Sequence, residues 1–154
     1  MGCYADKAVQ LFKEGYNCSQ AVFAAFAEDY GIDRELALRL SSSFGGGMGR
    51  MREVCGAVSG MFLTAGLETG SADGSDREGK AANYAEVQAL ADKFRKENGS
   101  IICRELLGLG QRDGQESHVP EERSGEYYKK RPCVELVRCA AEILEERYSL
   151  QRRR

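Results

Sequence analysis

Apolar residues recur at helical spacing along almost the whole chain, and this pattern restricts the fold more than any other feature. The first segment shows it, with apolar side chains three or four positions apart at Ala5, Ala8, Val9 and Phe12. That spacing places side chains on one face of an α-helix. No segment shows the alternation of apolar and polar residues that predicts a β-strand. We therefore expect an all-α fold.

Start and stop signals divide this pattern into six or seven helices. The expected helices cover about residues 5–12, 17–26, 33–40, 55–65, 76–97, 100–107 and 132–148. Asn17 begins the second helix with Gln20 three residues later, the spacing of a capping box, and Pro132 suits the first position of the last helix. No internal repeat or linker interrupts the series. The sequence thus predicts that residues 1–154 form a single-domain bundle of six to seven helices.

The segments between the helices are polar or rich in glycine, and residues 69–75 and 108–130 are expected to be loops. The segment 44–50, Phe-Gly-Gly-Gly-Met-Gly-Arg, cannot form an ordinary helix, because glycine destabilises helix interiors. Its glycines would let backbone N–H groups approach a bulky ligand. A phosphate-binding loop is the weaker interpretation, since the GK[ST] ending is missing, and a tight connection between helices is the plain alternative. We select Gly45, Gly46, Gly47 and Gly49 as candidate cofactor-binding residues.

Composition and charge exclude several classes of protein. The chain has 154 residues, 42% of them hydrophobic, and its formal net charge is −2. It therefore has no overall basic field for nucleic acid or an anionic membrane. No apolar run approaches the roughly 20 residues that span a bilayer, and the first residues lack the apolar region of a signal peptide. We expect a cytoplasmic protein, and six cysteines in that reducing compartment indicate metal binding or redox chemistry.

Four of the six cysteines fall in the first turn of an expected helix. Cys18 follows the cap Asn17, Cys55 follows the glycine-rich segment, and Cys103 and Cys133 begin the last two helices. Free backbone N–H groups and the helix dipole stabilise negative charge at such positions, and this lowers the pKa of a cysteine. All four would face the core. Any one of these cysteines, taken alone, is better explained as core packing than as a ligand. The four together, each in a first turn, lead us to predict one site of four thiolates.

Several other residues also bear on the predicted site. Gly56, directly after Cys55, lowers helix propensity and so suggests close packing against another element or the ligand. Arg50 and Arg52 could neutralise a thiolate cluster, but we expect them on the surface, as we do His118. Cys3 is expected in a mobile N-terminus, and Cys139 is expected on the far side of its helix from Val137. Both cysteines are left outside the site.

The motifs resemble those of the C_GCAxxG_C_C family, bacterial and archaeal proteins of about this length that are described as redox-active. The resemblance rests on GYNCSQ at residues 15–20, FGGGMG at 44–49 and CGAVSG at 55–60, followed by Cys103 and Cys133. It covers nearly the whole chain. It implies the same four cysteines, and Cys3 and Cys139 match nothing in the family pattern. Similarity of the family to part of the split-Soret cytochromes, and twin-arginine signals on some members, suggest an iron–sulfur cluster. The first residues show no twin-arginine motif, so we do not expect export.

Three hypotheses about function follow. The leading one is an electron-transfer protein that binds an iron–sulfur cluster, or another metal, through Cys18, Cys55, Cys103 and Cys133. The second is metal-free thiol–disulfide chemistry, with Cys18 and Cys55 as the first pair. The third is a non-catalytic helical module braced by a four-cysteine zinc site. The redox partner, any enzymatic activity and homo-oligomer formation are left open.

Overall fold

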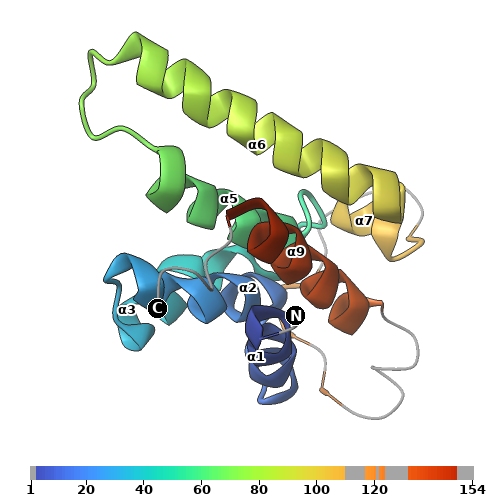
Figure 1. Ribbon diagram of the computed structural model, residues 1–154. Coiled ribbons are helices and arrows are strands. Elements are labelled where there is room, and N and C mark those ends of the chain that lie inside the picture. The colour runs from blue at the N-terminus through green and yellow to red at the C-terminus, as the bar shows by residue number, and fades with distance from the viewer. Residues whose placement is uncertain (1–2, 110–116, 121, 124–131, 149–154) are drawn as a thin grey trace.

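The computed structural model describes residues 3–109, 117–120, 122–123 and 132–148, and there it is an all-α structure (Figure 1). Its helices are α1 (Cys3–Lys13), α2 (Cys18–Ala27), α3 (Arg34–Ser41), α4 (Gly45–Met48), α5 (Gly56–Thr69), α6 (Arg77–Asn98), α7 (Cys103–Leu106) and α9 (Cys133–Tyr148), with 3-10 turns η1 (Glu28–Tyr30) and η2 (Ser42–Phe44). The predicted fold class is confirmed. Most of the expected loop 108–130 lies outside the described residues.

Helix α2 is the centre of the core. Every residue of its stretch from Ala21 to Ala27 is buried, because the sequence AVFAAFA is apolar on all sides and such a helix is stable only when it is surrounded. It packs against α1, α3, α5 and α9. On the α1 side the rings of Tyr4 and Phe26 stack with their centroids 4.7 Å apart. The N-terminus of α2 is therefore fixed within the body of the protein.

The start of α2 is held by the predicted capping box. The Asn17 side chain accepts from the backbone N–H of Gln20 at 2.9 Å, and the Gln20 side chain accepts from the N–H of Asn17 at 3.0 Å. The Gln20 amide also donates to the carbonyl of Leu38 in α3. These bonds satisfy N–H groups that a helix leaves unpaired. They also define the position of Cys18, the first residue of α2.

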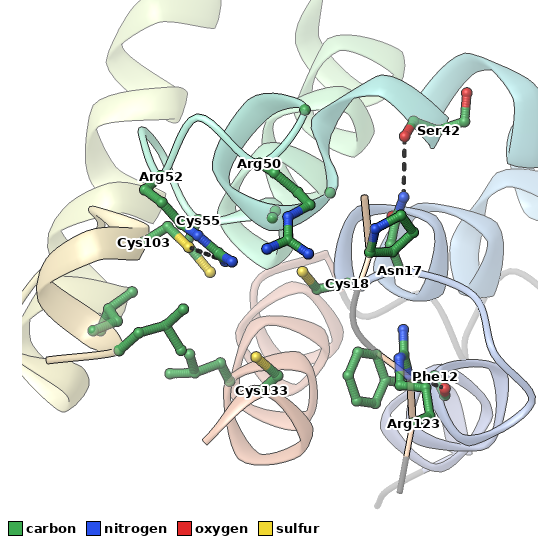
Figure 2. A pocket seen from close by; sticks show the side chains of 18 of the residues that line it. Phe12, Asn17, Cys18, Ser42, Arg50, Arg52, Cys55, Cys103, Arg123 and Cys133 are labelled. Atoms are coloured by element: carbon green, nitrogen blue, oxygen red, sulfur yellow. Dashed lines mark hydrogen bonds between the residues drawn. The ribbon is translucent and has the colours of Figure 1, made fainter. Parts of the chain in front are cut away.

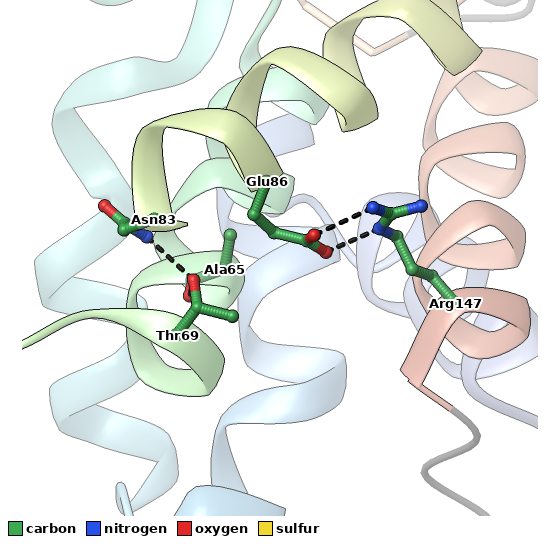
Figure 3. Close-up of polar contacts among 5 residues, drawn as sticks. All are labelled: Ala65, Thr69, Asn83, Glu86 and Arg147. Atoms are coloured by element: carbon green, nitrogen blue, oxygen red, sulfur yellow. Dashed lines mark hydrogen bonds and ion pairs between the residues drawn. The ribbon is translucent and has the colours of Figure 1, made fainter. Parts of the chain in front are cut away.

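The long helix α6 lies along the outside of the bundle, over α5 and α9 (Figure 1). Only its C-terminal half is deeply buried, through Leu90, Ala91 and Phe94. Arg147 of α9 donates to both carboxylate oxygens of Glu86, at 2.5 and 2.8 Å, and Figure 3 shows the two hydrogen bonds side by side. A bidentate pair of this kind fixes direction as well as distance. It therefore ties α6 to α9 at a defined register.

The glycine-rich segment forms a left-handed turn between α3 and α5. Residues 46–50 all have positive φ values, between 62° and 73°. The carbonyls of Gly45, Gly46 and Gly47 accept from the N–H groups of Arg50, Arg52 and Glu53. The prediction that this segment is no ordinary helix is confirmed. The expected donation of glycine N–H groups to a ligand stays a prediction.

Two expected boundaries were wrong. Ser100 does not open a helix, because residues 101–104 first pair with the chain after the glycine-rich turn, and α7 begins only at Cys103. Cys3 does not lie in an irregular N-terminus, since it is the first residue of α1, although its side chain is exposed.

Candidate functional site

A pocket of about 270 Å³ lies where the N-terminal ends of several helices meet, and Cys18, Cys55, Cys103 and Cys133 all line it (Figure 2). Cys18, Cys103 and Cys133 are the first residues of α2, α7 and α9, and Cys55 is the N-cap of α5. The cysteines selected from the sequence are thus brought together in one place. Their role as ligands stays a prediction.

Cys55 and Cys103 are fixed next to each other by paired backbone. An isolated antiparallel bridge joins Val54 to Ile102. The N–H of Cys55 donates to the carbonyl of Ile101 at 2.8 Å, and the N–H of Cys103 donates to that of Glu53 at 2.6 Å. Backbone hydrogen bonds of this kind position both thiols independently of their side-chain contacts.

The selected glycines make room for the cysteine side chains. A Cβ atom on Gly56 would lie 2.7 Å from Sγ of Cys18, and one on Gly47 would lie 2.6 Å from Cβ of Cys103. A Cβ atom on Gly45 would meet the Asn17 side chain at 2.4 Å. Gly45, Gly46, Gly49 and Gly56 line the pocket, and Gly47 packs behind Cys103. Their proposed contact with a cofactor stays a prediction.

The electrostatics of Cys55 differ from the expectation of a low pKa. Burial, followed by the neighbouring Cys18, raises the pKa of the Cys55 thiol well above its ordinary value. The backbone N–H groups of Val58 and Ala57 lower it, as the helix-terminus argument requires, but they are outweighed. In the protein alone this thiol is therefore protonated. A metal cation bound in the pocket would favour the thiolate.

Two arginines that we expected on the surface line this pocket. Arg52 is only 6% exposed, and its Nη1 atom lies 3.7 Å from Sγ of Cys103 (Figure 2). Arg50 donates through Nη1 to the carbonyl of Val119 at 2.6 Å. The surface assignment was therefore wrong for Arg52. Sequence reasoning missed it because the left-handed turn, which directs the side chain inward, has no signature in hydrophobic periodicity.

The described part of the segment 117–123 lies across one side of the pocket. Arg123 donates to the carbonyls of Phe12 and Tyr16 at 2.8 and 2.9 Å, and its guanidinium lies 4.1 Å from the centroid of the Phe12 ring. His118 is exposed, as expected, but it also lines the pocket. The described residues that line the pocket include three arginines and no aspartate or glutamate. Its lining is therefore suited to negative charge.

Cys139 lies outside the pocket. Its Sγ atom donates to the carboxylate of Glu97 at 3.2 Å and accepts from the amide of Asn98 at 3.4 Å. Burial raises its pKa to about 11. The separation of Cys139 from the other cysteines agrees with its expected position around the last helix.

The four cysteines line the pocket without forming a compact group of ligands for one ion. Among the residues that the structure describes, no three His, Cys, Asp or Glu side chains are arranged to hold a single metal ion. A tetrahedral ion with bonds of about 2.3 Å to sulfur needs sulfurs roughly 3.8 Å apart. A polynuclear centre binds each thiolate through a separate metal atom, and its ligands are spaced more widely.

Comparison with known proteins identifies relatives of this chain. A family model described as "Putative redox-active protein (C_GCAxxG_C_C)" matches residues 16–147. A protein of Archaeoglobus fulgidus named "Uncharacterized protein" is 28% identical over 144 residues, which are 89% of this chain and 87% of the relative. No solved structure shows significant similarity. None of the helices in the described part of the chain is long and apolar enough to cross a membrane.

Proposed function

This chain belongs to the C_GCAxxG_C_C family, and on that premise we propose that it is a redox-active protein whose four pocket cysteines hold an iron–sulfur cluster for electron transfer. One observation supports this most directly. Cys18, Cys55, Cys103 and Cys133 come from four separate helices and line one pocket. Four thiolates are the usual ligand set of such clusters.

The donor set and the shape of the pocket fit this group. The described lining offers four thiols, one exposed imidazole and no carboxylate, and thiolates select iron–sulfur clusters or zinc over hard cations. No three of the described His, Cys, Asp or Glu side chains are arranged around a single ion, and a cluster, whose thiolates bind separate metal atoms, needs no such compact group. When bound, a cluster supplies a one-electron carrier. Cys18, Cys55, Cys103 and Cys133 would hold it.

The walls of the pocket would shield such a centre. Leu106, Leu107 and Leu136 line one part and Phe12 another, and these apolar side chains would limit the access of water to a bound centre. At Gly45 and Gly46 the backbone itself forms part of the pocket wall. A side chain at either position would collide with neighbouring residues. Burial and hydrogen bonds to sulfur are the means by which a protein adjusts the potential of a cluster.

Thiol–disulfide chemistry is the second candidate, supported by the interaction of Cys55 with Cys18. The Cys18 sulfur lies beside Gly56, the residue that follows Cys55, and both cysteines line the pocket. The raised pKa of Cys55 opposes this function, however, because the thiolate is the attacking form. We therefore rank thiol–disulfide chemistry second, after cluster binding.

Anaerobic reconstitution tests the proposal. The full chain, reduced and then incubated with ferrous iron and sulfide, should gain visible charge-transfer absorption that bleaches on reduction and returns on reoxidation. Iron and sulfide should be present in stoichiometric amounts after desalting. A colourless protein without iron would contradict the cluster, and one zinc per chain without redox activity would support the bracing role instead. Formation of a reversible disulfide between Cys18 and Cys55, found by mass spectrometry of metal-free protein, would support the second candidate.

A further inference from the structure

Arg52 reaches the cysteine pocket through an unusual stretch of backbone. The five consecutive residues 46–50 adopt the left-handed conformation, and Arg52 follows with φ of 63°. Met48 and Arg50 in this turn, and Arg52 after it, carry a Cβ atom, for which positive φ is costly. Left-handed residues normally occur singly. Strained backbone of this kind persists where the surroundings over-determine it, and it concentrates at functional sites.

The surroundings of Arg52 fix both its backbone and its side chain. Its N–H donates to the carbonyl of Gly46, and its carbonyl accepts from the N–H of Arg104. A Cβ atom on Gly47 would lie 2.8 Å from Cα of Arg52, so the two backbones are in direct contact. The guanidinium then extends to within 3.7 Å of the Cys103 sulfur (Figure 2). Backbone bonds and a side-chain contact therefore both hold Arg52 at Cys103.

The contact with Cys103 has an electrostatic consequence. A guanidinium is permanently charged in proteins, and the Arg52 side chain carries this charge into the protein, because the residue is only 6% exposed. An N–H···S bond from a charged donor stabilises negative charge on sulfur. In a buried site this stabilisation is stronger than in water. It is therefore largest in the redox state that carries the more negative charge.

We propose that Arg52 is a positioning residue that raises the reduction potential of the centre held by Cys103 and the other three pocket cysteines. This inference rests on the proposed iron–sulfur function. A bound centre would accept one electron from a one-electron donor without a bond forming or breaking, and the net charge of the site would fall by one. Arg52 keeps its proton throughout. Its charge and its N–H···S bond both favour the reduced state.

The test compares reduction potentials of reconstituted full-length proteins by spectroelectrochemistry. Arg52→Gln removes the charge, and Arg52→Lys keeps the charge but loses the planar fork of donors. Arg104→Gln is the matched control, because Arg104 follows Cys103 in the chain but does not line the pocket. We expect Arg52→Gln to lower the ratio of reduced to oxidised protein about tenfold at fixed potential, or ~59 mV for one electron. Arg52→Lys should fall between it and the unaltered protein, and Arg104→Gln should have no effect.

Each outcome of this comparison either supports the role of Arg52 or overturns it. Equal potentials for the loaded unaltered protein and both Arg52 variants would overturn this inference and leave the cluster in place. Failure of the unaltered protein to bind iron would overturn the proposed function and this inference with it. If Arg52→Gln does not fold, Arg52→Lys and the NMR signals of the Arg52 guanidinium provide the test. Those signals should shift in Cys103→Ala and stay constant in Cys139→Ala, and unchanged signals in both variants would contradict the contact.

Discussion

Gly56 lies so close to Cys18 that a Cβ atom on the glycine would stand 2.7 Å from the cysteine sulfur. The contact joins the N-terminal ends of α5 and α2 at the pocket. It explains why a residue with poor helix propensity occupies the first turn of a buried helix. Because glycine has no side chain, this position leaves room for the Cys18 thiol.

Gly56→Ala should therefore both destabilise the protein and disturb the pocket. We expect a loss of about 1–3 kcal/mol in the free energy of unfolding, the typical cost of overpacking, and reduced iron incorporation. Gly66→Ala in the same helix is the control. Nothing lies within 4 Å of a Cβ atom on Gly66, so alanine should be neutral or stabilising there by up to ~1 kcal/mol. Urea unfolding of both variants makes the comparison, and equal effects would contradict the account.

Asn17→Ala should cost about 1 kcal/mol in stability through loss of the helix cap. It should also reduce iron binding, because Asn17 lines the pocket, packs against Gly45 and donates to the carbonyl of Ser42. Asp33→Ala removes the cap of α3, whose side chain accepts from the N–H of Leu36, away from the pocket. That variant should lose similar stability and keep normal iron content. If the iron content falls in proportion to the loss of stability in both variants, Asn17 has no separate role at the site.

Arg123→Ala should release the described residues 117–120 from the pocket. Its guanidinium holds this segment to the end of α1 through the carbonyls of Phe12 and Tyr16. We expect faster hydrogen–deuterium exchange in 117–120 and faster alkylation of Cys133 in metal-free protein. Arg138→Ala breaks a different contact with α1, the ion pair to Asp6, and should leave both rates unchanged. No difference between the two variants would show that Arg123 does not hold the segment.

The Glu86–Arg147 pair should make stability depend on pH in the acid range. The hydrogen bond from Arg147 lowers the pKa of Glu86 in the folded protein. A carboxyl with a lowered pKa contributes stability above its unfolded value of about 4.3, and this is lost as pH falls through the folded pKa. Glu86→Gln should thus cost up to ~1 kcal/mol at pH 7, and the difference should shrink below about pH 4. Glu78→Gln, an exposed position on the same helix, is the control. A difference that stays constant from pH 7 to pH 3 would exclude this mechanism.

Much of the fold and of the candidate site could be predicted because it depends on local signals. The capping box of Asn17 and Gln20 acts within a few residues, and Asn17 caps α2 in the structure. First-turn cysteines follow from the same signals. Local signals do not place Cys18 near Cys133. That prediction also assumed that the N-terminal ends of the helices pack together, and both cysteines do line the pocket.

The parts that sequence reasoning missed depend on contacts between distant segments. Arg52 enters the pocket because a left-handed turn redirects it and because Cys103 is brought beside it by the Val54–Ile102 bridge. The pKa of Cys55 was expected to be low from the helix terminus alone. Burial and the neighbouring Cys18 reverse that direction, and neither is visible in a local pattern.

The central claim is that four cysteines form one cluster site and the other two do not. The most direct test is anaerobic reconstitution of six single cysteine-to-serine variants, with iron content and visible absorption measured after desalting. Substitution of Cys18, Cys55, Cys103 or Cys133 should each abolish or strongly reduce the cluster. Cys3→Ser and Cys139→Ser should match the unaltered protein, because Cys3 is exposed on α1 and Cys139 bonds to Glu97 and Asn98. Iron binding that survives in all four pocket variants, or that is lost equally in all six, would contradict the account.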